Sequence, residues 1–152
     1  MSRPENPPPA PAPTADAVAA ALAGVIGDLA GSEIASAYLF GSTASGRRHR
    51  ESDVDVAVLL RWSAHPGRAE RFDAGLRLAG RLQAALGRTV DLVVLNDAPP
   101  LLGRAVVTQG MRLLLRDAAV DHAYVRDVSL RAADLEPWLR RFRGRKLEAL
   151  HR

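Results

Sequence analysis

The sequence has no cysteine, a single lysine (Lys146) and few aromatic residues, which make up 5% of its 152 residues. The absence of cysteine excludes a disulfide framework and any thiolate metal site. Charged residues interrupt every apolar run well short of the ~18 residues that a membrane-spanning helix requires. The N-terminus has no apolar core of the signal-peptide kind. These absences predict a cytoplasmic protein with no membrane partner.

The formal net charge of +4 and the isoelectric point near 10.5 would ordinarily suggest a polyanionic partner. Nearly all of the positive charge comes from arginine, and alanine is also abundant. A GC-rich genome produces the same bias, so the charge gives little support for binding to DNA or RNA. We therefore do not expect nucleic acid to be the direct substrate.

The chain is long enough for one domain with a buried core. Residues 1–13 hold six of the ten prolines, and such a segment predicts a disordered or polyproline-like tail. Residues 14–117 carry the alternating helix and strand signals of one domain. Residues 118–152 read as a helical C-terminal extension.

Apolar runs predict short strands at Ala35–Phe40, Val54–Leu60 and Thr89–Leu95. Met111–Leu115 fits either a final strand or the extension of a helix. Strands that alternate with helical segments indicate a layered α/β (α+β) domain around one sheet.

Helical periodicity predicts four helices. The first begins at Thr14 or Asp16 and ends at Gly31–Ser32. The second spans residues 69–86, is capped by Gly87, and is expected to face inward with Phe72, Leu76, Leu78, Ala79 and Leu82. The others are Leu101–Gln109 and Val120–His151, the last with a possible break before Pro137.

Three aspartates stand in or next to two of the predicted strands. Alternate side chains of a strand share a face, so Asp53 and Asp55 point the same way. Asp91 lies among apolar neighbours, where a lone carboxylate is costly unless it is paired or metal-bound. If the two strands are neighbours, the three carboxylates form one site of the kind that Mg²⁺ prefers. Two such ions ~3.5–4 Å apart can hold the attacking and leaving oxygens of an in-line displacement.

The first strand ends in Gly41–Ser42, which suits phosphate binding. Glycine lets phosphate oxygens approach the backbone, and amides at a helix start bind anions. Ser42 adds a hydroxyl donor, and the guanidinium of Arg47 can neutralise a polyphosphate. A P-loop is excluded because its required Lys-Ser/Thr pair is absent.

The pattern of Gly41–Ser42, ten residues, Asp53-Val54-Asp55 and a later Asp91 resembles the DNA polymerase β-like nucleotidyltransferase superfamily. The segment around it is similar to the minimal nucleotidyltransferase (MNT) branch, most of all to the MntA-type antitoxins of HEPN–MNT toxin–antitoxin pairs. The resemblance covers residues 15–117. It implies a polymerase β-like palm, with a small mixed sheet flanked by helices.

The resemblance also implies an activity: these antitoxins transfer AMP from ATP to a tyrosine of a partner HEPN ribonuclease toxin. By resemblance, Gly41 and Ser42 hold the triphosphate and the three aspartates bind Mg²⁺. Asp91 would also accept the proton of the attacking hydroxyl. The branch commonly has arginine where this chain has Ser45, and Arg47 stands two positions further on.

Two other functions are compatible with the sequence. One is nucleotidylation of a small molecule, as in aminoglycoside-modifying relatives, although only about 30 residues remain for substrate binding. The other is a non-catalytic antitoxin that neutralises its toxin by contact alone. The basic amphipathic segment Trp138–Arg152 has a solvated charged face or serves as a docking helix for a partner.

Overall fold

The computed structural model of the protein describes residue 11 and residues 13–28, 33–41 and 53–150, with side chains described as far as residue 141. Most of the predicted N-terminal tail lies outside these residues. So do the helix end predicted at Gly31–Ser32 and the predicted phosphate-binding residues Ser42 and Arg47.

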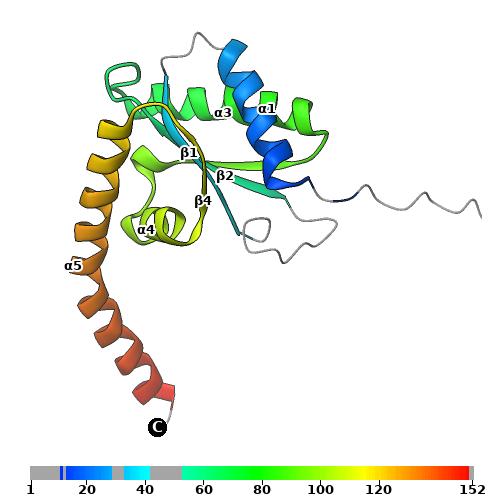
Figure 1. Ribbon diagram of the computed structural model, residues 1–152. Helices are drawn as coiled ribbons and strands as arrows, with labels where there is room; N and C mark the ends of the chain where they lie inside the picture. The colour runs from blue at the N-terminus through cyan, green and yellow to red at the C-terminus, as the bar shows by residue number, and fades with distance from the viewer. Residues whose placement is uncertain (1–10, 12, 29–32, 42–52, 151–152) are drawn as a thin grey trace, which may run out of the picture.

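A single mixed sheet of four strands forms the centre of the described chain (Figure 1). Its strands are β1 (Ile34–Phe40), β2 (Val54–Leu60), β3 (Val90–Val94) and β4 (Met111–Leu115). Their order is β3-β2-β1-β4; β1 is antiparallel to both of its neighbours, and β2 and β3 are parallel. The segment whose pattern fitted either a strand or a helix is therefore an edge strand.

The helices are α1 (Ala15–Asp28), α3 (Arg68–Leu86), α4 (Pro100–Gln109) and α5 (Ala118–Leu150), with a 3-10 turn, η1, at Leu95–Asp97. Of the two alternatives for the start of the first helix, Thr14 is confirmed and Asp16 is wrong, because α1 begins at Ala15. The cap predicted at Gly87 is also confirmed. The Ala17 amide donates to Oγ1 of Thr14 at 3.2 Å, and Gly87 ends α3 with a left-handed φ of 65°.

The helix break predicted before Pro137 is wrong, because α5 continues through this residue. A proline inside a helix removes one backbone hydrogen bond and crowds the preceding turn. The neighbouring Glu136 is held by Arg104 of α4 at 2.5 Å, and Ala132 is fully buried. Contacts with the body thus stabilise the turn that the proline weakens.

The two faces of the sheet pack against different helices. On β2, the even-numbered residues from Val54 to Leu60 join the core formed with α1 and α3. Ala57 and Leu59 join the opposite core, together with residues of α4 and α5. The predicted alternation along β2 is confirmed, and it places Asp55 on the face that carries α4 and α5.

The inward face predicted for α3 is partly wrong. Leu78 and Leu82 are buried, but Phe72 is 64% and Leu76 58% exposed. The buried stripe of α3 instead begins at Arg71 and continues through Ala74 and Gly75. Phe72 and Leu76 follow that stripe by one residue, about 100° around a helix with 3.6 residues per turn. The helix has more apolar residues than one face can bury.

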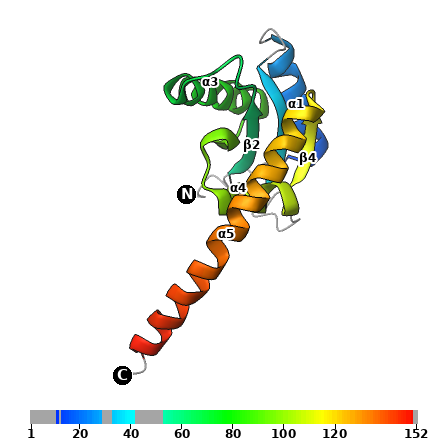
Figure 2. The same ribbon diagram turned by 90° about the vertical axis from the view of Figure 1, so that its left-hand side faces the viewer.

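Helix α5 packs on the sheet with its first turns and projects away from the body with its last (Figures 1 and 2). Its 33 residues correspond to a length of about 50 Å. Leu130 and Trp138 on this helix are 64% and 57% exposed. No helix in the described part of the chain is long and apolar enough to span a membrane. The domain boundary expected near residue 117 stays a prediction.

A buried hydrogen bond fixes α5 to the sheet. The Tyr38 hydroxyl on β1 donates to Oδ1 of Asp121 at 2.6 Å, and Asp121 is 1% exposed. Burial and the adjacent carboxylate raise the pKa of Tyr38. Replacing Tyr38→Phe leaves this carboxylate oxygen without its donor. We expect the free energy of unfolding in urea to fall by about 1–3 kcal/mol, the cost of an unsatisfied buried polar group.

Tyr124 provides the matched control. Its hydroxyl is also buried but has no hydrogen-bond partner among the described residues, and burial raises its pKa to about 12. Tyr124→Phe removes the same atom without breaking a hydrogen bond and eliminates a buried hydroxyl that has no partner among the described residues, so stability should be unchanged or slightly higher. Equal losses in the two variants would contradict the assigned role of the bond between Tyr38 and Asp121.

Candidate functional site

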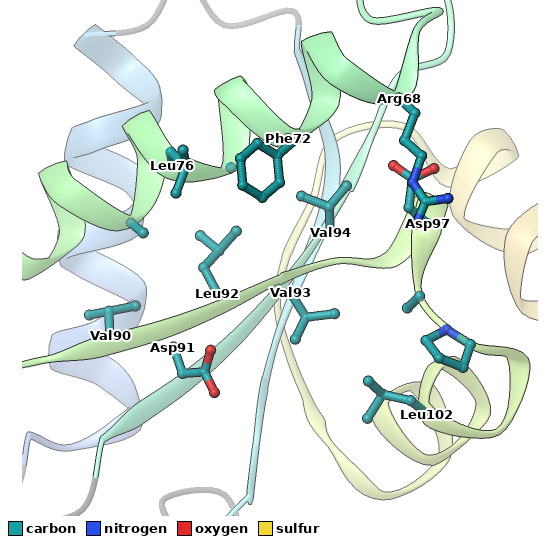
Figure 3. Close-up of a pocket in the computed structure, with 14 residues that line it drawn as sticks. Arg68, Phe72, Leu76, Val90, Asp91, Leu92, Val93, Val94, Asp97 and Leu102 are labelled. Carbon is teal, nitrogen blue, oxygen red and sulfur yellow. The ribbon is translucent and has the colours of Figure 1, made fainter.

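Two of the three predicted site aspartates lie side by side in the sheet. Asp55 and Asp91 are direct partners in the parallel pairing of β2 with β3. Side chains of paired residues project from the same face, and neighbouring strands lie about 4.8 Å apart. Figure 3 shows Asp91 and Val93 on the side of β3 away from α3, opposite to Leu92 and Val94. The sheet therefore brings together two carboxylates that are 36 positions apart in the sequence.

Asp53 extends this pair. The Val54 amide donates to the Thr89 carbonyl at 3.0 Å, so the pairing of β2 with β3 begins immediately after Asp53. Asp53 precedes Asp55 by two residues, the spacing at which extended residues share a face. Asp53 and Asp91 are exposed, whereas Asp55 is half-buried.

The electrostatics of Asp55 show that the three carboxylates interact. Burial, followed by the charges of Asp91 and Asp53, raises the pKa of Asp55 above its usual value. The described residues contain no group of three acidic or imidazole side chains already arranged around one metal position. Carboxylates that repel each other are expected to separate in the absence of a cation.

A metal-free pH titration tests this repulsion. At about pH 3, below the usual Asp pKa, Asp55 is neutral in both the folded and the unfolded chain and has no effect. As the pH rises through its raised folded-state pKa, the folded state must accept a charge that it disfavours, and stability is lost. Near pH 7 and in EDTA, Asp55→Asn should therefore unfold at a higher urea concentration than the wild type.

Two further results are expected in the same experiment. The difference between the proteins should vanish at about pH 3, and Mg²⁺ should stabilise the wild type more than the variant. A wild type that is more stable than Asp55→Asn near pH 7 in EDTA would contradict the repulsion.

Gly41 stands directly against Asp55, one member of the acidic pair. It follows Phe40, which pairs with Asp55 across β1 and β2. Its φ of 73° lies in the left-handed region that favours glycine. A Cβ at this position would collide with Oδ2 of Asp55. Both the backbone conformation and the nearby carboxylate thus require glycine at the end of β1.

Arg71 is the centre of a cluster of contacts beside the site, which the sequence did not predict. The Arg71 guanidinium donates to both oxygens of Asp97 at 2.8 and 2.9 Å and to the carbonyls of His65 and Pro66. It also lies over the ring of Trp62, 4.8 Å from its centroid. The guanidinium holds the pKa of Asp97 below its usual range. This buried arginine fixes α3 to η1, the turn that follows β3.

A groove of about 400 Å³ runs along the outer side of β3 (Figure 3). Its lining includes Asp91, residues of α3 on one side and Leu102 of α4 on the other. Phe72 and Leu76, which were expected to face the core, line this groove. Their apolar character had suggested burial, and only the position of α3 beside an edge strand shows where they lie.

Comparison with known proteins gives concordant results. The model of the family described as "Polymerase beta, Nucleotidyltransferase" matches residues 29–119. The protein adenylyltransferase MntA of Shewanella oneidensis is 45% identical over 78 residues, which are 50% of this chain and 50% of that protein. The matched segment therefore spans about half the length of this curated relative.

Solved structures are similar over more of the chain. A chain of a toxin–antitoxin complex with AMP-PNP has a TM-score of 0.61 and 27% identity, covering 88% of this chain and 98% of the other. The structure of a tri-AMPylated Shewanella oneidensis HEPN toxin in complex with MNT antitoxin gives 0.58 and 24%, covering 91% and 100%. The second likeness shows the fold alone.

Proposed function

This chain belongs to the polymerase β nucleotidyltransferase family, and from that premise we propose that it is a Mg²⁺-dependent protein adenylyltransferase. Its proposed role is that of an antitoxin in the cytoplasm, which transfers AMP from ATP to a tyrosine of a partner HEPN toxin. The in-register pair of Asp55 and Asp91, next to Gly41, carries this proposal.

Asp53, Asp55 and Asp91 are the proposed metal ligands. They supply only carboxylate oxygens, the donors that Mg²⁺ prefers. The raised pKa of Asp55 means that the folded protein disfavours the negative charge of this carboxylate. A bound cation would stabilise that charge. When bound, two Mg²⁺ ions would neutralise charge on the triphosphate and on the attacking and leaving oxygens.

The chain's own residues have distinct proposed roles. Gly41 lets the triphosphate approach the end of β1, and Ser42 and Arg47 contribute a hydroxyl and a guanidinium to its oxygens. The tyrosine oxygen attacks the α-phosphorus and forms the new P–O bond. The bond from that phosphorus to the bridging oxygen breaks, and pyrophosphate leaves with the electron pair. The tyrosine proton passes to the carboxylate of Asp91.

The relatives support the choice of nucleotide and acceptor. One is a protein adenylyltransferase, and one was crystallised as a toxin–antitoxin complex with AMP-PNP. Transfer to a small molecule is less well supported. In the described chain, α5 is the only helix that follows the sheet, which leaves little additional structure for binding such a substrate.

Incubation with the HEPN toxin, Mg²⁺ and ATP labelled at the α-phosphate tests the proposal. Label should appear on a toxin tyrosine and should be absent when EDTA is added. ATP labelled at the γ-phosphate should leave the toxin unlabelled, because that label departs with pyrophosphate. A chain that neutralises the toxin without transferring the α-label would instead be an antitoxin that acts by binding.

A further inference from the structure

The structure arranges the site in a fixed order across the sheet. Gly41 stands at the end of β1, Asp55 on β2 and Asp91 on β3, and the groove lies beyond β3. We propose that the acceptor polypeptide binds as an extended segment along the outer edge of β3. Its tyrosine would then reach Asp91 from the side opposite to the triphosphate. This inference rests on the proposed adenylyltransferase function.

The first support is the open edge of β3. This strand pairs with β2 on one side and, among the described residues, has no strand on the other. Its first amide, that of Val90, donates to Oε1 of Gln83 at 3.1 Å, so the edge open to another chain begins after Val90. An edge strand presents unpaired N–H and C=O groups that can pair with another chain. Adding an extended peptide to such an edge is a common mode of recognition, in which backbone hydrogen bonds supply affinity. The five residues of β3 give a length of about 17 Å.

The second support is the two apolar walls of the groove. Phe72 and Leu76 of α3 form one wall and Leu102 of α4 the other, on opposite sides of β3 (Figure 3). Phe72, Leu76 and Leu102 are 64%, 58% and 37% exposed. Side chains of an added strand alternate between the two sides, so apolar residues of the acceptor would contact both walls. The groove thus fits an extended polypeptide with apolar side chains.

The third support is the geometry of the transfer itself. Attacking and leaving oxygens lie roughly in line on opposite sides of the phosphorus. The proposed triphosphate position at the end of β1 and the proposed acceptor position beyond β3 lie on opposite sides of Asp55, as this geometry requires. The Asp91 carboxylate both lines the groove and is the proposed proton acceptor, so it lies where the acceptor hydroxyl would enter.

The wall that α3 contributes is anchored to the turn that follows β3. Arg71, which is 6% exposed, ties α3 to η1 through Asp97, and η1 directly follows β3. Arg68 and Asp97 line the end of the groove away from Asp91 (Figure 3). A peptide along β3 would therefore have a charged boundary at one end and the reacting carboxylate at the other.

The test uses the double variant Phe72→Ser/Leu76→Ser, which removes apolar surface from exposed positions. We expect the KM for the HEPN toxin to rise at least about tenfold, since apolar burial on binding is lost. Affinity for ATP should be unchanged. Leu130→Ser is the matched control, because Leu130 is 64% exposed on α5 and does not line the groove. Equal effects in the groove variant and the control would overturn the proposal.

Hydrogen exchange provides a second readout that does not depend on activity. Amides within residues 91–94 should exchange more slowly when a synthetic peptide spanning the modified toxin tyrosine is added; Val90 is left out because its amide already donates to Gln83. Unchanged exchange there would overturn the proposal. The proposal would also be overturned if the wild type formed a homodimer and the groove variant did not. In that case the groove would bind a second copy of this chain.

The outcomes also separate the two proposals. If the wild type transfers no AMP to the toxin, the proposed function fails. If the wild type and the groove variant transfer AMP with the same KM for the toxin, only the acceptor groove fails.

Discussion

Replacing Asp53 and Asp55 together by asparagine is expected to lower AMP transfer to the HEPN toxin by about 10³-fold or more. Several kcal/mol of charge stabilisation by metal ions correspond to a rate factor of that size. The rate of label transfer from ATP at saturating Mg²⁺ measures the effect. The fold should persist, because Asp53 is exposed and the half-buried Asp55 has a raised pKa, which marks an unfavourable charge.

Asp134→Asn is the control for this experiment. Asp134 is an exposed carboxylate on α5, so its replacement removes one negative charge without touching the site. The control variant should transfer AMP at the wild-type rate. A double Asp53→Asn/Asp55→Asn variant that retained more than about a tenth of the wild-type rate would refute the metal-binding role of these two residues.

Gly41→Ala is expected to lower AMP transfer by about 100-fold and to destabilise the protein by about 1–2 kcal/mol. The stability loss follows from a non-glycine residue in the left-handed region. The loss of activity has a separate cause, because the new Cβ would collide with Oδ2 of Asp55 and displace that carboxylate. A misplacement of about 1 Å at a reacting group can cost a factor of about 100. Urea unfolding and the rate of label transfer measure the two effects.

Gly87→Ala separates the two causes. Gly87 also has a left-handed φ, 65° against 73° at Gly41, but a Cβ there meets nothing within 4 Å. This variant should lose a similar amount of stability while it keeps its transfer rate. If Gly41→Ala kept full activity as well, the contact between Gly41 and Asp55 would not matter for the reaction.

Local patterns were sufficient for much of the fold. Apolar runs predicted β1, β2 and β3 to within about one residue of their observed ends. Thr14 and Gly87 marked their helix ends correctly, because capping depends on a few neighbouring residues. Alternation along β2 placed Asp55 on one face and Val54 and Val56 on the other.

The same local patterns failed where packing decides. A helical stripe could not show that Phe72 and Leu76 line a groove, since their exposure depends on what lies beside α3. The segment of β4 was ambiguous until its pairing with β1 was known. Pro137 predicted a break that contacts between α4 and α5 prevent.

The sequence by itself determined the residue types of the site: three carboxylates at strand positions and a glycine after the first strand. Those features depend on spacing over a few residues. In a strand this spacing decides which side chains share one face of the sheet. Only the tertiary structure decided that β3 lies next to β2 in the register that pairs Asp91 with Asp55. Strand order results from the burial of both faces of the sheet by helices distant in the sequence, and no local pattern encodes it. The open edge of β3 and its groove likewise exist only once α3 and α4 have packed on opposite sides of the sheet.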